Sequence, residues 1–492
     1  MFHNDAARLA CAERIGTPRL PILGVFLGAA LVGYLLTMNV TAALGFLGVL
    51  VLFSIASQQP AVLLPPLVIL PVVMEATLQS VSITIGGRPL LNFYGVVNVG
   101  LAAAVVFFML TDRIRPFDSL VTGAFVLYLA AVVFSLSFSA DTMMTVRSLV
   151  RISSGFFLYL MITQFLTEKR QIDRLFQIVV IVSAIPIAVG LYQIAIRNHF
   201  ALSRTLRIKG TLINGMSYGM YLAMILPYIF GQVVFAKGGW IRRSLFAVLF
   251  LAGLVNLVYA STRIGWGVFA LTMILYGLLT DVRRLLPVIL AAMILAGVLF
   301  APFFAQSFGG FFETDWRTYL SNDIRWDARS AEYVTASSLH IRVYVWRHML
   351  HQLWATRPLF GVGSGTWFLN FDLKTMGLPI ASHSDYFEVL FGTGFIGLLL
   401  YLLFRFRQLV LLGRFARGRI ERRIKTTVLF PCLASHIACL GMSITEVWQS
   451  YACVYWLSWI MIGISECYYE RHLQAQPDRI APATTPPDIR YN

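Results

Sequence analysis

Charged residues are scarce in this sequence, and that scarcity excludes most soluble folds. Only 13% of the 492 residues are charged, whereas roughly 25% is usual for a soluble globular protein. Apolar runs of about 18 residues or more recur along most of the chain, as they do in membrane-spanning helices. A soluble enzyme is therefore excluded. An outer-membrane barrel is excluded as well, because its strands would alternate apolar and polar residues.

Cysteines and clusters of metal ligands are also few. The five cysteines are odd in number and form no CxxC pair. Four of them lie in or beside apolar runs, where small buried residues are expected. The sequence contains no DxD motif and no cluster of His and Cys. It therefore predicts no disulfide framework, no metal site and no cofactor.

The apolar runs predict an all-α, polytopic membrane protein with about fourteen transmembrane helices, twelve or thirteen being the alternatives. Pro65, Pro66 and Pro71 are expected to kink or break the third helix. The predicted helices cover residues 20–38, 41–58, 60–77, 93–111, 118–137, 148–167, 173–195, 212–235, 241–260, 264–280, 285–303, 388–404, 425–445 and 450–466.

The basic residues predict how these helices are oriented. The net charge of +16 lies in short clusters between apolar runs, which does not favour nucleic-acid binding. The clusters occupy alternate loops, so both termini are predicted to be cytoplasmic. The most basic loop begins at Arg405 and ends at Lys425. The chain then divides into eleven spans at 1–303, a large periplasmic loop at 304–387, three spans at 388–466, and a cytoplasmic, Pro-rich tail at 467–492 that is expected to be disordered.

Some basic residues occur on the outer side, where the charge rule disfavours them. One group is Arg204, Arg207 and Lys209, in the loop before residue 212. Guanidinium groups pair with phosphate oxygens, so an anion site is one interpretation, and a solvated loop against lipid headgroups is the other. Arg263, in a tight turn between two spans, either snorkels to the interface or points into a cavity. For Arg147, Arg151 and Glu75, a functional role and simple anchoring at the membrane interface both stay open.

The large outer loop contains a predicted amphipathic helix, SLHIRVYVWRHMLHQLWATRP. Such a helix lies flat on a membrane or caps a helical bundle. The GVGSG segment at 361–365 follows it, and no strand precedes that segment and no GK[ST] follows it, so a tight turn is favoured over a nucleotide loop. The apolar residues of the predicted helix, spaced by three and four, are Ile341, Val345, Trp346, Met349, Leu350, Leu353 and Trp354.

His383 stands immediately before the span predicted at 388–404. Histidine can remove a proton from a hydroxyl near neutral pH, so His383 is a candidate general base. Asp385 and Glu388 are candidate acids to orient its ring.

Several motifs of this region together resemble the O-antigen ligase and polymerase superfamily, whose members have many spans and one large late periplasmic loop. Upstream, the turn around Arg263 and the segment from Arg207 to Asn214 are also similar to that family. The motifs that carry the resemblance are Arg342-x-x-x-Trp346, Pro358-Leu-Phe-Gly-Val-Gly363, His383, and Gly394-Phe-Ile-Gly397.

The resemblance implies metal-independent glycosyl transfer from an undecaprenyl-diphosphate-linked glycan, at the periplasmic face of a bacterial inner membrane. His383 would then activate the acceptor hydroxyl. Arg342 and Arg263 would bind the diphosphate and stabilise its charge as it leaves. The basic residues Arg204, Arg207 and Lys209 are interpreted as assisting them.

The acceptor distinguishes two functions within this family. Polymerisation of exopolysaccharide or O-antigen repeat units is favoured over ligation to lipid A-core, because the predicted spans exceed twelve and Ser384 stands where the family often has Asn. The partners implied are the lipid-linked donor, a glycan or lipid A-core acceptor, membrane lipid and a chain-length regulator.

A lipid-linked glycan flippase is the rival from another class. Flippases and transporters commonly have mid-membrane charges, whereas here the main one is His436, which is expected to be a hydrogen-bonded core residue.

Overall fold

The computed structural model of the protein describes residues 60–80, 82–85, 88–196, 207–280, 326–327, 332–333, 338–366 and 382–474. Within these ranges the chain is helical apart from two antiparallel hairpins. One pairs β1 (Ser82–Ile85) with β2 (Arg88–Asn92), and the other pairs β3 (Trp326–Asp327) with β4 (Glu332–Tyr333). The helices predicted at 20–38, 41–58 and 285–303 lie outside the described residues.

Most described helices follow the predicted apolar runs. Seven described segments are long and apolar enough to cross a membrane, which supports a membrane protein and leaves the count of fourteen as a prediction. The helices are α4 (Pro60–Ser80), α5 (Phe93–Leu110), α6 (Thr122–Phe134), α7 (Thr142–Phe165), α8 (Lys169–Val182), α9 (Ala184–Ile196), α10 (Gly215–Phe235), α11 (Trp240–Tyr259), α12 (Arg263–Leu279), α16 (Ser338–Thr356), α17 (Asp385–Arg417), α18 (Arg422–Ile424), α19 (Phe430–Met442) and α20 (Ala452–Gln474).

The span predicted at 173–195 is two helices, α8 and α9. They meet at Ser183, whose hydroxyl donates to the carbonyl of Val180 at 2.6 Å. Pro186 has no N–H to donate to the carbonyl of Val182, so the helical hydrogen bonds are interrupted at this point. The two helices together still form one candidate membrane span, Lys169–Ile196, so the predicted span is present with a break at Ser183.

The last helix also differs from its predicted end. α20 continues to Gln474, beyond the boundary predicted at 466, because Cys467 and Tyr468 are buried against the bundle. The hydroxyl of Tyr468 donates to Asp173 of α8. The start of the predicted tail is therefore helix, and the residues after 474 lie outside the described ranges.

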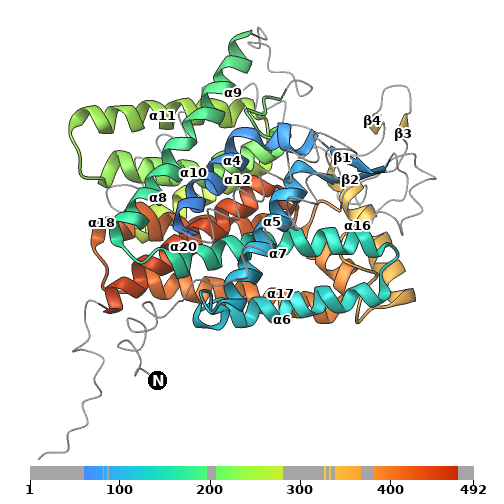
Figure 1. Ribbon diagram of the computed structural model, residues 1–492. Helices are drawn as coiled ribbons and strands as arrows, with labels where there is room; N and C mark the ends of the chain where they lie inside the picture. The colour runs from blue at the N-terminus through green and yellow to red at the C-terminus, as the bar shows by residue number, and fades with distance from the viewer. Residues whose placement is uncertain are drawn as a thin grey trace, which may run out of the picture.

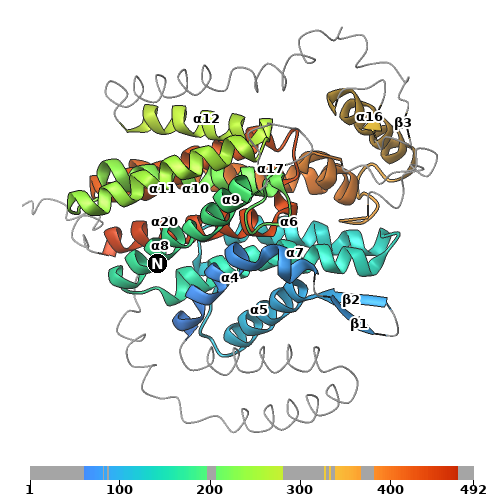
Figure 2. The same cartoon turned by 90° about the horizontal axis from the view of Figure 1, so that it is seen from above.

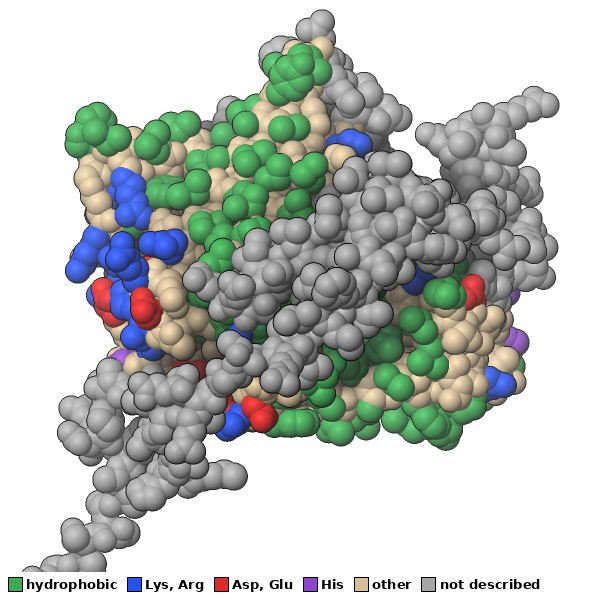
Figure 3. Space-filling view, viewed as in Figure 1, with side chains coloured by type: hydrophobic (Ala, Val, Ile, Leu, Met, Phe, Trp, Pro, Cys, Tyr) green, Lys and Arg blue, Asp and Glu red, His purple; other side chains and the backbone are tan. Residues whose placement is uncertain are grey.

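Basic side chains gather at one end of the molecule. Most Lys and Arg side chains visible in Figure 3 lie at its left, the end where Figure 1 places α18 and the start of α11. At this end Arg242 donates to Gln177 of α8 at 2.9 Å. The β1–β2 hairpin and α16 lie at the opposite end in both ribbon views (Figures 1 and 2). This separation agrees with the charge-based orientation, which stays a prediction.

Arg405 does not lie in the basic loop that the sequence predicts. It is 3% exposed inside α17, and its guanidinium carbon lies 4.8–5.0 Å from the ring centroids of Tyr401, Phe404 and Trp448. Aromatic faces partly offset the cost of burying the charge. Because α17 continues to Arg417, the basic turn begins later than predicted.

α17 is sharply bent at Gly394. This residue has φ +70° and ψ −173°, a conformation that favours glycine. The rings of Tyr386 and Tyr401 lie 6.2 Å apart, although a straight helix would separate these positions by about 22 Å. The span predicted at 388–404 is therefore corrected to two limbs. Residues 395–417 are long enough to cross a bilayer core of about 30 Å, and residues 385–393 are not.

The bend is stabilised by the glycine-rich segment that follows α16. A break in a helix leaves carbonyl and N–H groups without helical partners, and such groups must be satisfied where water is absent. Residues 358–363 satisfy four of them. The N–H groups of Val362 and Gly363 donate to the carbonyls of Phe391 and Gly392 at 3.1 and 3.0 Å, and those of Phe395 and Ile396 donate to the carbonyls of Pro358 and Leu359 at 2.9 and 3.3 Å.

These contacts explain why the segment contains glycine. Gly361 has φ +73°, and a Cβ there would lie 2.5–2.6 Å from the backbone of α17. The GVGSG segment is thus a backbone partner of α17, which agrees with the predicted tight turn.

We expect Gly394→Ala to destabilise the protein by more than about 2 kcal/mol, because its Cβ would lie 2.2 Å from the backbone of Leu359 and φ is positive. The thermal unfolding midpoint in detergent measures the effect. Gly413→Ala is the control, because that position of α17 has no atom within 4 Å of the added Cβ and alanine favours helix. Equal midpoints for the two variants would contradict the bend.

Candidate functional site

α16 lies against α17, and its buried stripe is narrower than predicted. Val345, Met349 and Leu353 are 0–2% exposed and pack on Leu390 and Phe391 of α17. Two further residues of the predicted stripe, Leu350 and Trp354, are exposed instead. The predicted helix is therefore present, and the fully buried part of its stripe is one side chain per turn.

Trp346 fixes the register between α16 and the start of α17. Its indole N–H donates to the carbonyl of Ser382 at 2.7 Å, and its ring stacks on Phe387 with a centroid distance of 4.8 Å. Arg342 lies one turn earlier on α16, so it reaches the chain next to His383. The Arg-x-x-x-Trp spacing thus has a geometric reason.

Glu446 brings His383 and Arg342 together. Its Oε2 atom lies 3.9 Å from His383 Nδ1 and 4.0 Å from Arg342 Nη2. The other carboxylate oxygen accepts the hydroxyl of Tyr451 at 2.7 Å, and Glu446 is only 1% exposed. Glu446 is absent from the predicted site residues because it is distant in sequence from His383. Its only sequence signal is an acid between the last two predicted spans.

Burial and the charge of Glu446 shift the pKa values of Arg342 and Tyr451. Burial lowers the pKa of the Arg342 guanidinium, and the carboxylate of Glu446 opposes that effect. Since the ordinary pKa of arginine is above 12, Arg342 stays charged. Burial, and then the charge of Glu446, raise the pKa of Tyr451, which keeps its phenol neutral and able to donate.

His383 occupies a strained backbone conformation. Its φ is +48°, which is uncommon for a residue with a side chain and is concentrated at functional sites. Ser384, the next residue, caps α17 by accepting the N–H of Phe387. The imidazole is 31% exposed, so an approaching group can reach it.

The predicted orienting acids lie in different surroundings. Asp385 is 1% exposed, accepts the hydroxyl of Ser443 at 3.2 Å, and interacts electrostatically with Arg405. These contacts hold its carboxylate in the interior, away from His383. Glu388 is half-buried one turn along α17, and its orienting role stays a prediction.

The segment with Arg207 and Lys209 is held beside the turn that precedes Arg263. The N–H of Ile208 donates to the carbonyl of Tyr259 at 3.4 Å, and the side chain of Gln193 accepts the N–H of Lys209 at 3.0 Å. Arg207 and Lys209 are exposed, and Arg263 is half-buried. Arg204 lies outside the described residues.

Glu75 has a structural role at the same end. Its carboxylate accepts the N–H of Ile213 at 3.4 Å and that of Cys453, at the start of α20, at 3.3 Å. An acid at a helix N-terminus also stabilises the helix dipole. Glu75 thereby ties residues 207–214 to α20. Arg151, half-buried in α7, donates to Ser450 nearby at 3.4 Å.

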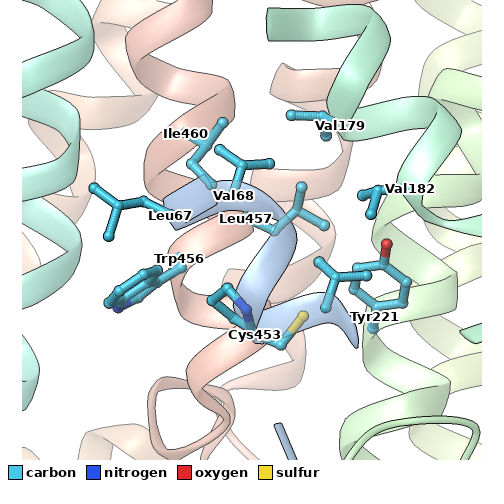
Figure 4. Close-up of a pocket in the computed structure, with 11 residues that line it drawn as sticks. Leu67, Val68, Val179, Val182, Tyr221, Cys453, Trp456, Leu457 and Ile460 are labelled. Atoms are coloured by element: carbon cyan, nitrogen blue, oxygen red, sulfur yellow. The ribbon is translucent and has the colours of Figure 1, made fainter. Parts of the chain in front are cut away.

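Other buried features fit core packing. His436 accepts or donates hydrogen bonds with the Cys432 carbonyl at 2.7 Å and the Ser458 hydroxyl at 2.9 Å, which confirms its expected place. Figure 4 shows an apolar cavity between α4, α8, α10 and α20, around Tyr221 and Trp456. Its volume of about 10 Å³ is too small for a substrate. Among the described residues no group of three or more His, Cys, Asp or Glu that could hold a metal ion occurs.

Comparison with known families identifies part of the chain. Residues 246–402 match the family model described as O-antigen ligase (Wzy_C). These residues, less than half of the chain, are similar to an O-antigen ligase domain. This confirms the superfamily that the sequence resembles, and it indicates glycan transfer of the O-antigen ligase or polymerase type. The matched residues include Arg263, Arg342 and His383, whereas Glu446 lies beyond them. No curated protein matches the chain.

Proposed function

We propose that this protein transfers a glycan from undecaprenyl diphosphate to a sugar hydroxyl at the periplasmic face of the inner membrane. The observation that best supports the proposal is the cluster of His383, Arg342 and Glu446. A base and a cation from separate parts of the O-antigen ligase domain meet there at one buried carboxylate.

The chemical step needs a base for the acceptor. The acceptor hydroxyl oxygen forms a bond to the anomeric carbon of the donor sugar, and the bond from that carbon to the diphosphate oxygen breaks. His383 accepts the hydroxyl proton as this bond forms. Since Nδ1 faces Glu446, Nε2 is the ring nitrogen that receives the proton. The diphosphate leaves on the lipid with an added negative charge.

Arginines stabilise the leaving diphosphate in this proposal. Arg342 is 14% exposed and stays charged, and a preorganised cation is most effective where water is excluded. Arg263 begins α12, whose next turn packs near Met442 of α19, shortly before Glu446. The segment with Arg207 and Lys209 adjoins the Arg263 turn and adds further positive charge. No metal ion is required in this scheme.

Polymerisation of repeat units is the favoured reaction, with another lipid-linked glycan as acceptor. Ligation to lipid A-core is the second candidate, and the match to an O-antigen ligase family favours it. Both reactions share the donor, the leaving group and the base. The length of the glycan and the lipid that carries it separate them.

His383→Ala is expected to reduce transfer by at least about 100-fold while the protein still accumulates in the membrane, because it removes the base. The measurement is the surface and lipid-linked glycan profile of a deletion strain that carries the variant. Single repeat units would indicate a lost polymerase. Long chains retained on the lipid diphosphate would indicate a lost ligase. A wild-type profile would contradict the base assignment, and repeat units retained at the cytoplasmic face would favour a flippase.

Arg342→Lys is expected to be impaired by about 10-fold or more, since one ammonium does not replace the paired donors of a guanidinium. Transfer rates in membranes measure it, with protein amounts equalised. Arg347→Lys is the matched control, because Arg347 lies on the same helix and is exposed. The same loss in both variants would argue against a specific role for Arg342.

A further inference from the structure

We propose that Glu446 is the positioning residue for His383. It orients the imidazole through Nδ1 and balances the positive charge that the ring gains when it takes the acceptor proton. This inference rests on the proposed function, in which His383 is the base. It places part of the catalytic machinery outside the residues that match the O-antigen ligase family.

The geometry around Glu446 carries the proposal. Its Oε2 atom is buried, accepts no hydrogen bond in the described structure, and faces the ring of His383 at 3.9 Å. A hydrogen bond needs about 3 Å, and catalytic contacts commonly tighten when substrate binds. The Oε1 atom is already occupied by Tyr451, so the carboxylate cannot rotate freely and Oε2 stays directed at the cluster.

The other charged groups near His383 are less suited to this role. Asp385 is engaged by Ser443 and lies near Arg405 on the interior side. Glu388 is one turn further along α17 and is half-buried. Arg342, from α16, is a cation that shares the Oε2 atom of Glu446. Glu446 places a carboxylate oxygen 3.9 Å from Nδ1 of the imidazole.

The turn that carries Glu446 is fixed to α17 on both sides. Before Glu446, the carbonyl of Ser443 accepts the N–H of Asp385 at 3.0 Å and the hydroxyl of Ser384 at 3.1 Å. The residues that bind the turn are thus the two that follow His383. The hydrogen bonds to the carbonyl of Ser443 therefore join the chain beside His383 to the turn that carries Glu446.

After Glu446, Trp448 completes the attachment. Its indole N–H donates to the hydroxyl of Ser443 at 2.8 Å, and its ring lies 4.8 Å from the guanidinium of Arg405. The amide of Gln449 donates to the hydroxyl of Tyr401 at 2.7 Å. Contacts of this kind hold an orienting carboxylate in a fixed position.

The test compares Glu446→Gln and Glu446→Asp with the wild type in membranes that contain the full-length protein. Lipid-linked glycan extracted from a deletion strain is the probe. Glu446→Gln keeps the shape of the side chain and removes its charge. We expect kcat to fall by about 100-fold and the acidic limb of the pH–rate profile to move to lower pH, because protonating the ring becomes less favourable. Glu446→Asp keeps the charge and should retain part of the activity.

Glu466→Gln is the matched control. Glu466 is also fully buried and also accepts a tyrosine hydroxyl, that of Tyr159 at 2.6 Å, but it lies about 20 Å further along α20 from its start. Removing the charge of Glu466 can lower the stability of the protein, yet it should leave the pH–rate profile unchanged. If the Glu446→Gln protein does not accumulate in the membrane, the test rests on Glu446→Asp. For that variant we expect a lower kcat, with the acidic limb of the pH–rate profile at its wild-type position.

The outcomes separate this inference from the proposed function. If His383→Ala is inactive while Glu446→Gln has the kcat and pH profile of the wild type, the role of Glu446 is overturned and the proposed base stands. If His383→Ala is fully active, the proposed function fails, and the inference fails with it. A profile shift shared by Glu446→Gln and Glu466→Gln would show a general effect of buried charge and would also overturn the inference.

Discussion

The bend of α17 at Gly394 is the constraint on which the candidate site depends. A helix broken near the membrane must find new partners for its freed carbonyl and N–H groups. Residues 358–363 provide them, and they approach so closely that Gly361 and Gly394 have no room for a side chain. The bend therefore binds the end of α16 to α17 through backbone atoms. This fixes the position of α16 without relying on any particular side chain in the segment.

The bend determines where the reactive side chains meet. Because α17 is bent, its N-terminus lies next to the turn after α19, where the N–H of Asp385 donates to the carbonyl of Ser443. Trp346 then aligns α16 with the residue before His383. Arg342, His383 and Glu446, which are far apart in the sequence, converge for this reason. Arg405 supports the same junction from the interior, which accounts for a buried cation inside an apolar helix.

Hydropathy predicts most of the described helices because long apolar runs have few alternatives in a membrane. Motif resemblance points to Arg342 and His383, and both residues lie within the range that matches the O-antigen ligase family. The bend at Gly394 could not be predicted, since residues 389–404 form an almost continuous apolar run and a glycine inside such a run does not indicate a bend. Charge alone misplaced Arg405, because the third of its aromatic neighbours, Trp448, comes from a distant part of the chain. Glu446 is brought to His383 only by tertiary contacts.

The most direct test of this account is the distance between the two limbs of α17. A short thiol cross-linker is applied to the full-length protein with Tyr386→Cys and Tyr401→Cys, and the products are identified by mass spectrometry after proteolysis. The account predicts a cross-link between these positions, whose rings lie 6.2 Å apart. The pair Leu398→Cys and Tyr401→Cys, one helical turn apart, is the positive control. A cross-link in the control pair and none between positions 386 and 401 would contradict the bend, and with it the assembly of the site.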